Sequence, residues 1–300
     1  MYAIIGASGN TGSAVAGKLL NQGKNVRVIG RDAKRLEPLV RRGAEAFVAN
    51  VSDAAALTKA FSGAEAVYLM IPPNPGIPNV REDQERVSDA LTAAVKNAGV
   101  EYAVVLSSVG ADKPDKTGPV VGLHNLEQKL NGVTALKALY VRAGYFMENL
   151  LPQVMVIQNF GVMGGPLRGD LKVPMIATQD IGAVAAEALA KLEFTGKEAH
   201  ELLGNRDLSY LEIAPIIGNA IGKPDLGYMQ LPPVQLKPAL VQMGMSSNMA
   251  DLLFEMSDAL NSGYMAPLER RSGQNTTPTS IETFVAEQFV PRFTGKAARI

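Results

Sequence analysis

The first twelve residues carry the pattern that most constrains the fold of this chain. A short apolar run, Tyr2–Ile5, leads directly into the heptapeptide GASGNTG at residues 6–12, and helical periodicity follows over residues 13–20. This order predicts a strand, a glycine-rich turn and the start of a helix. The free N–H groups and positive dipole end of a helix N-terminus favour a phosphate anion. The spacing G-x-x-G-x-x-G is a variant of the dinucleotide fingerprint, so we expect a dinucleotide site here, the alternative being an ordinary strand-to-helix turn.

Composition excludes several other classes of protein. The 29 basic and 29 acidic residues among 300 give a formal net charge of zero, so no nucleic-acid partner is indicated. There is no cysteine, which excludes disulfides and thiolate chemistry, and with only His124 and His200 no metal site is expected. No apolar run reaches the length of a membrane span, and the chain opens with a strand rather than a signal peptide. We therefore expect a cytoplasmic protein with no membrane partner.

Strands and helices alternate through the first half of the chain. The candidate strands after the first lie at residues 25–29, 44–48, 66–71, 102–106 and 138–142. Helical periodicity fills residues 11–22, 53–61 and 81–98, and the first and last of these helices end at Gly23 and Gly99. This alternation predicts an α/β fold, a Rossmann-like doubly wound parallel sheet with helices on both faces.

The alternation is lost after about residue 150. One helix at residues 180–192 still suits the sheet, and beyond it we expect short strands at 201–203 and 228–231 and helices at 210–221, 233–243 and 249–260. We therefore predict an NAD(P)-binding domain over residues 1–155, against which the helix at 179–192 also packs, and a smaller, mostly helical substrate-binding domain over residues 156–300. Ligands of such sheets bind at the carboxyl ends of the strands, where the second domain is expected to contact substrate.

The end of the second strand bears on which dinucleotide binds. NAD sites usually place a carboxylate there, which binds the ribose hydroxyls. This chain has Gly30 followed by Arg31 and Asp32, with Lys34 and Arg35 close behind. The missing acid and the planar charged guanidinium of Arg31 favour the 2′-phosphate of NADP. NAD is the less favoured alternative, in which Asp32 binds a ribose and the basic residues form a solvated helix face.

Several later segments, taken in order, identify a family resemblance. They are LSS at 106–108, HNLEQ at 124–128, VRAGYFMENL at 141–150, Asp180-Ile181 before an alanine-rich helix, and TPTSIETFV at 277–285. Together with GASGNTG they make the chain similar, over nearly its whole length, to the NmrA-like group of atypical short-chain dehydrogenases. Within that group it most resembles the small NAD(P)H-dependent quinone and azo reductases.

The resemblance implies which residues hold the cofactor. Those that wrap the pyrophosphate are Gly6, Ser8, Gly9, Asn10, Thr11 and Gly12. Arg31 is then expected to reach the adenosine phosphate, and Asn50 stands where the family often has an acid near the adenine. The residues expected beside the cofactor at the end of the fourth strand are Met70, Ile71 and Pro72. Ser107 and Tyr145 are expected near the nicotinamide.

The usual catalytic pair of short-chain dehydrogenases is absent. That pair is Tyr-x-x-x-Lys, and none of the eight tyrosines has a lysine four residues later. The related benzylic ether and isoflavone reductases instead use a lysine in the helix after the fifth strand, and His124 stands near that position. His124 is therefore either a proton donor or a residue that caps or packs its helix. The candidate catalytic residues are His124, Tyr145 and Ser107.

These observations favour an NADPH-dependent oxidoreductase that transfers hydride to a quinone-like or other apolar conjugated small molecule. Reduction of such an electrophile needs no dedicated acid, which agrees with the missing pair. The methionines at 243, 245, 249 and 256 either line an apolar cleft or fill the core.

The alternative function is a non-catalytic NAD(P)-binding redox sensor that controls a protein partner. The basic residues of the C-terminal tail, Arg292, Lys296 and Arg299, are too few to decide for it. A sugar-nucleotide epimerase is disfavoured because that chemistry needs the absent Tyr-Lys pair. We expect a monomer or a homodimer.

Overall fold

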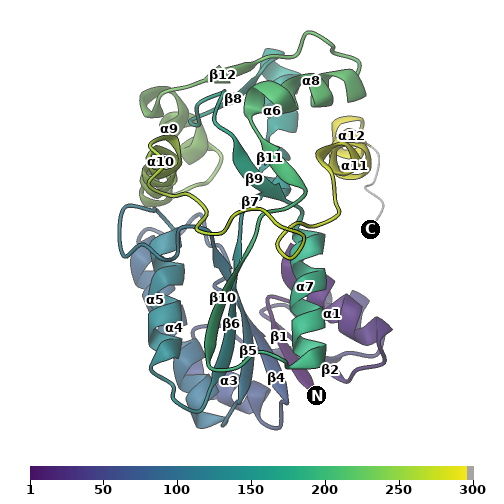
Figure 1. The fold of residues 1–300 in the computed structure, drawn as a ribbon, viewed down its shortest axis with the longest axis vertical. Helices are drawn as coiled ribbons and strands as arrows, with labels where there is room; N and C mark the ends of the chain where they lie inside the picture. The colour runs from purple at the N-terminus through teal and green to yellow at the C-terminus, as the bar shows by residue number, and fades with distance from the viewer. Residues whose placement is uncertain (296–300) are drawn as a thin grey trace.

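A parallel sheet of seven strands forms one half of the molecule in the computed structural model, which describes residues 1–295 (Figure 1). The strands lie in the order β10-β6-β5-β4-β1-β2-β3. Their bounds are β1 Tyr2–Ile5, β2 Val26–Gly30, β3 Glu45–Val48, β4 Ala66–Leu69, β5 Tyr102–Ser108, β6 Lys137–Ala143 and β10 Lys197–Leu202. The predicted Rossmann-like, doubly wound fold is confirmed.

Helices cover both faces of this sheet because its strands are apolar on both sides. In β1, Tyr2 and Ile4 face one core while Ala3 and Ile5 face another, as the period of two requires. The first core is closed by α1 (Asn10–Asn21) and α7 (Thr178–Lys191). The opposite core is closed by α3 (Ala54–Phe61), α4 (Val80–Asn97) and α5 (Val120–Asn131). A short helix, α2 (Ala33–Val40), follows β2.

The chain returns to this sheet after residue 156. The short strand expected at 201–203 is longer than predicted, and as β10 it pairs with β6 from Lys197 opposite Ala138 to Leu202 opposite Ala143. The predicted helix at 180–192 is confirmed as α7, which packs against α1 so closely that a Cβ added at Gly182 would lie 2.3 Å from the Cβ of Ala14. Two elements that pack in or on the sheet, β10 and α7, therefore come after residue 155 in the sequence.

We call residues 1–143 and 177–203 the sheet lobe, and residues 144–176, 204–261 and 281–295 the cap lobe. The cap lobe contains two small sheets, β11-β9-β7 and β12-β8, of whose strands the mostly helical prediction included only β12, expected at 228–231. Its strands are β7 Tyr145–Phe146, β8 Met163–Gly165, β9 Val173–Ile176, β11 Arg206–Leu208 and β12 Tyr228–Gln230. Its helices are η1 Met147–Leu150, α6 Gln153–Phe160, α8 Tyr210–Ala220, α9 Pro233–Gln242, α10 Ser247–Asn261, α11 Ile281–Phe284, η2 Val285–Phe289 and α12 Val290–Phe293. Lys296 and Arg299 of the tail lie outside the described residues.

An irregular segment, residues 262–280, runs between the lobes from α10 to α11, and we call it the crossing segment (Figure 1). Buried carboxylates of the sheet lobe fix it. Glu201 accepts hydrogen bonds from the N–H groups of Leu268 and Glu269 at 3.0 and 2.8 Å. Asp180 accepts from the N–H and hydroxyl of Thr279 at 3.0 and 2.7 Å. The crossing segment is therefore part of the folded wall between the lobes.

Candidate cofactor and substrate site

The glycine turn between β1 and α1 has a geometry that only glycine allows at two positions. Gly6 has a φ of +67°, in the left-handed region, and a Cβ there would lie 2.4 Å from the sulfur of Met70. A Cβ on Gly12 would lie 2.3 Å from the Gly6 carbonyl oxygen. The Gly9 N–H closes the turn by donating to that same oxygen at 2.8 Å. The turn therefore brings the start of α1 directly against the end of β1.

The N-terminus of α1 suits a pyrophosphate. Its N-cap is Gly9, no side chain caps the N–H groups of its first turn, and that turn holds no acid. Free N–H groups and the helix dipole are therefore available to an anion. The structure brings together in this turn all the residues predicted to wrap the pyrophosphate, namely Gly6, Ser8, Gly9, Asn10, Thr11 and Gly12.

One of the basic residues after β2, Arg35, reaches this turn. A Cβ on Gly30 would lie 3.1 Å from a methyl carbon of Leu36, so a larger residue at position 30 would crowd the buried leucine. Arg31 is exposed, while the Asp32 carboxylate accepts a hydrogen bond from the Lys34 N–H at 2.9 Å and so caps α2. Arg35 donates to the Ser8 carbonyl at 3.2 Å, which holds its guanidinium at the glycine turn.

Asn50 follows β3, on the strand next to β2. The neighbouring Ala49 N–H donates to the Gly30 carbonyl at 3.0 Å, which places the two strand ends side by side. The side-chain oxygen of Asn50 accepts from the Ser52 N–H at 3.2 Å. The structure therefore puts Asn50 at the same edge of the sheet as Arg31, as the prediction requires.

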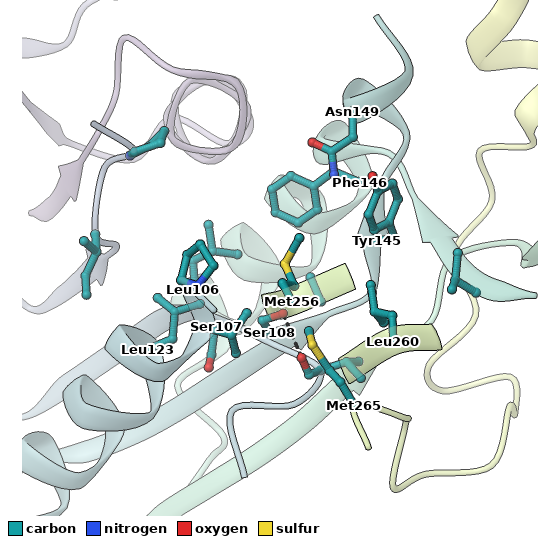
Figure 2. A pocket seen from close by; sticks show the side chains of 18 of the residues that line it. Leu106, Ser107, Ser108, Leu123, Tyr145, Phe146, Asn149, Met256, Leu260 and Met265 are labelled. Atoms are coloured by element: carbon teal, nitrogen blue, oxygen red, sulfur yellow. Dashed lines mark hydrogen bonds between the residues drawn. The ribbon is translucent and has the colours of Figure 1, made fainter. Parts of the chain in front are cut away.

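A cavity of about 400 Å³ lies between the lobes, at the carboxyl ends of β4, β5 and β6 (Figure 2). Its lining includes Ser107 and Tyr145, which were predicted near the nicotinamide, and the three residues predicted beside the cofactor, Met70, Ile71 and Pro72. Because the Met70 sulfur packs against Gly6, the cavity begins where the glycine turn ends.

The far wall of the cavity is apolar and comes from α10 and the crossing segment. Of the four predicted methionines, Met249 and Met256 line the cavity. Met243 is exposed, and Met245 packs against a small apolar cluster that includes Met249. Sequence reasoning missed Met265, because the crossing segment has no periodicity that would indicate which of its residues turn inward.

Ser107 lines the cavity, but its hydroxyl proton is already engaged. It donates to the buried Glu127 carboxylate at 2.5 Å, and the same carboxylate accepts from Arg142 at 2.6 and 3.1 Å. A charge-assisted bond of this length keeps the serine proton directed at α5 rather than at a ligand. Ser107, Glu127 and Arg142 thus join β5, α5 and β6 behind the cavity wall.

His124 is not among the residues that line the cavity. Its Nδ1 lies 2.9 Å from the Ala111 carbonyl oxygen, and since a carbonyl only accepts, Nδ1–H is the donor. This contact ties α5 to the loop after β5 and supports the packing interpretation of His124. Its role as a proton donor stays a prediction.

Tyr145 lines the cavity together with Phe146 and Asn149 of the same segment (Figure 2). Its hydroxyl lies 3.4 Å from the hydroxyl of Tyr210, the first residue of α8. Burial raises the pKa of Tyr145, and burial raises the pKa of Tyr210 well above the ordinary value, so both phenols keep their protons at neutral pH. No sequence pattern predicts this pair, because the two tyrosines are 65 residues apart and come from separate elements.

The described residues offer no metal site and no membrane-spanning helix. Within residues 1–295, no three side chains of the metal-binding types gather in one place. No helix among these residues is both long enough and apolar enough to cross a bilayer.

The fold and the glycine turn define a Rossmann-like protein with a dinucleotide-type phosphate turn, joined to a cap lobe that closes an apolar cavity. The chain belongs to the NmrA-like family, whose model matches residues 2–285.

Two relatives align with most or all of the chain. An NAD(P)H azoreductase of Xenophilus azovorans is 30% identical over 302 residues, which span 100% of this chain and 94% of that protein. Quinone oxidoreductase 2 of Escherichia coli K12 is 28% identical over 268 residues, which span 88% of this chain and 89% of that protein. The fold is also that of an Escherichia coli NADPH-dependent quinone oxidoreductase solved with NADPH, with a TM-score of 0.81 and 24% identity over 96% of this chain and 100% of that one.

Proposed function

We propose that this protein is an NADPH-dependent reductase of quinone-like or other apolar conjugated small molecules. The observation that carries the proposal is the continuity between the glycine turn and the apolar cavity, which meet at the contact of Met70 with Gly6. The names of the relatives, an NAD(P)H azoreductase and a quinone oxidoreductase, support the same chemistry.

The residues of the site divide this task between them. The glycine turn would hold the pyrophosphate, and Arg31 the 2′-phosphate. When bound, NADPH supplies a hydride. The apolar wall formed by Met249, Met256 and Met265 would orient a flat ring and exclude water, since methionine side chains adapt to varied ligand shapes. Orientation then supplies much of the rate, because a positioned electrophilic acceptor needs little further activation.

Turnover is the first test of the proposal. The purified protein is mixed with NADPH and a panel of acceptors, menadione, a benzoquinone and an azo dye, and cofactor oxidation is followed by absorbance. Multiple turnovers with at least one acceptor are expected. Intact NADPH binding with no turnover across the panel would contradict the proposal and favour the redox sensor.

Cofactor preference tests the role of Arg31. Removing its guanidinium deletes charge-assisted hydrogen bonds worth about 1.5–3 kcal/mol, so Arg31→Ala should weaken NADPH binding by roughly 10- to 100-fold. NADH, which has no 2′-phosphate, should change by less than about threefold. Arg41→Ala is the matched control, because Arg41 is an exposed residue at the other end of α2. Equal losses for the two cofactors would remove Arg31 from the phosphate site.

A further inference from the structure

Two tyrosine hydroxyls meet at the wall of the cavity, one from each side of the cap lobe. Tyr145 lines the cavity, and Tyr210 stands behind it with only 6% of its surface exposed. Their hydroxyl oxygens are 3.4 Å apart. In Figure 2 the Tyr145 ring lies beside Asn149 in the cavity wall.

Tyr210 is held in place from its other side. Its ring stacks on that of Tyr228, with centroids 4.4 Å apart and planes 25° from parallel. The Tyr228 hydroxyl in turn donates to the Leu167 carbonyl at 2.8 Å. The Tyr210 ring is therefore held in place, and its hydroxyl oxygen lies beside that of Tyr145.

Two other hydrogen-bond donors at the cavity are engaged elsewhere. The Ser107 proton is bound by Glu127, and the Nζ of Lys172 lies 2.9 Å from Glu212. Tyr145 presents its hydroxyl at the cavity, and the Tyr210 hydroxyl lies behind its oxygen.

We propose that Tyr145 donates the proton that completes reduction of the substrate, and that Tyr210 is the positioning residue that hydrogen-bonds the Tyr145 oxygen. The pair would replace the Tyr-Lys pair that the chain lacks. This inference rests on the proposed function, because it assigns the proton of the same reduction.

The step balances without a further reactant. The substrate accepts a hydride from NADPH, which is oxidised to NADP⁺, and negative charge is left on a substrate oxygen or nitrogen. That atom forms a bond to the Tyr145 proton while the Tyr145 O–H bond breaks, and the phenolate oxygen keeps the electron pair. Hydrogen bonds from Tyr210 and from the Asn149 amide oppose the rise in the Tyr145 pKa that burial causes, because they stabilise this phenolate. Water then returns a proton to Tyr145.

Phenylalanine variants test the pair, because they remove a hydroxyl and keep the ring. Tyr145→Phe should lower kcat by roughly 100-fold and Tyr210→Phe by roughly 3- to 10-fold, with KM within about twofold in both. Tyr210→Phe made in the Tyr145→Phe background should have no additional effect, since it acts through the missing hydroxyl. Tyr102→Phe is the matched control, because the Tyr102 hydroxyl contacts Lys137 at the amino end of β5 and is remote from the cavity, and it should leave kcat unchanged.

A second measurement needs no turnover. 4-Nitrophenolate carries an anionic oxygen on a flat ring, and its absorption band moves to shorter wavelength when that oxygen accepts a hydrogen bond. The wild-type protein should bind it with a band shift that Tyr145→Phe abolishes and Tyr210→Phe reduces, with unchanged thermal unfolding. If Tyr210→Phe matches the wild type in both measurements, the proposed role of Tyr210 in positioning Tyr145 is contradicted, and the reductase proposal is unaffected. If no acceptor is turned over but the band shift follows the tyrosines, the reductase proposal fails and the pair is supported.

Discussion

Glu127 connects three parts of the sheet lobe through one buried side chain. It accepts hydrogen bonds from Ser107 of β5 and from Arg142 of β6, while its own backbone belongs to α5. Only 2% of its surface is exposed, so these bonds replace the water that the carboxylate gave up on folding. At the residue scale, the structure of the site therefore depends on the buried Glu127 carboxylate, which does not itself line the cavity.

Removal of Glu127 should be far more costly than removal of Ser107. Glu127→Ala leaves the Arg142 guanidinium unpaired, and we expect a loss of about 3 kcal/mol in the free energy of unfolding. Ser107→Ala removes one hydrogen bond and should cost about 1 kcal/mol, with hydride transfer changed by less than about twofold. Urea titration and single-turnover kinetics measure both quantities. A large rate loss for Ser107→Ala at nearly full stability would restore Ser107 as a catalytic residue.

At the scale of elements, the N-termini of two helices contact carboxylates whose pKa values are shifted in opposite directions. Glu148 caps α7 by accepting from the N–H and hydroxyl of Thr178 at 3.0 and 2.5 Å. Glu212 forms a capping box with Ser209 at the start of α8 and also pairs with Lys172. Burial raises the pKa of Glu148, whereas Lys172 and Ser209 lower the pKa of Glu212 to about 2.

The two caps should therefore give opposite pH dependences of stability. The folded protein holds the Glu148 proton more tightly than the unfolded chain, so the stability from Glu148 is present below pH 4.5 and falls as the pH rises through its raised pKa. Ionised Glu212 stabilises α8 above pH 4.5, and its contribution is lost as the pH falls through about 2. Glu148→Gln and Glu212→Gln should each flatten one side of a plot of urea midpoint against pH. A change on the same side for both would contradict these assignments.

The contact between β1 and α1 offers a sharp test of the glycine turn. In Gly12→Ala the new methyl would lie 2.3 Å from a backbone oxygen, so α1 must move away from β1. We expect NADPH affinity to fall by about tenfold or more, and stability by about 1–3 kcal/mol. Gly17→Ala in the same helix is the control, because its methyl meets only the movable Arg42 guanidinium. Calorimetric NADPH binding that is equal in the two variants would contradict the role of the turn.

The elements that could be predicted are those that carry their own local signal. The six strands β1 to β6 that alternate with helices are apolar or bounded by glycine, and the G-x-x-G-x-x-G spacing located the glycine turn between β1 and α1. β10 was only partly found, because Lys197–Leu202 is an edge strand with charged residues and no apolar run. Edge strands often carry charged side chains, and these obscure the alternation of apolar and polar residues by which a strand is predicted.

The site was predictable where it follows from the topology of a parallel sheet. Met70, Ser107 and Tyr145 follow or end neighbouring strands, and the carboxyl ends of such strands meet at one edge. Tyr210 and Met265 come from the cap lobe and the crossing segment, and their positions depend on packing between segments distant in sequence. No pattern of residue spacing in the sequence predicts such a contact.

At the scale of the whole molecule, α10 holds the two lobes together over the cavity. Its Glu255 accepts from the Arg81 guanidinium of α4 at 3.1 and 3.3 Å and from the Gly118 N–H at 3.2 Å. A Cβ on Gly118 would lie 2.0 Å from the Leu252 carbonyl oxygen, so the loop before α5 lies directly against α10. Since α10 also supplies Met249 and Met256, this contact sets the width of the cavity.

Loss of the Glu255 contact should loosen the cavity without affecting the phosphate turn. Glu255→Ala should raise the KM for the acceptor by about three- to tenfold and leave the NADPH dissociation constant within about twofold. Asp251→Ala is the matched control, because Asp251 of the same helix pairs with Lys237 of α9 within the cap lobe. Steady-state kinetics and fluorescence titration separate the two quantities. A parallel rise of KM in the Asp251 variant would assign the effect to α10 as a whole.

The place of β10 in the sheet also bears on synthesis of the chain. When the ribosome has released only the first 155 residues, β6 has no outer partner, and the apolar face that Ile181 and Leu189 of α7 will cover is open to water. At about 5–20 residues per second, roughly fifty more residues take several seconds to arrive. During that interval the nascent sheet exposes both an unpaired edge and a bare apolar face, the two features that favour aggregation. A nascent chain stalled near residue 155 should therefore expose the unpaired edge of β6 to chaperones, and one stalled well beyond residue 202 should have that edge covered by β10.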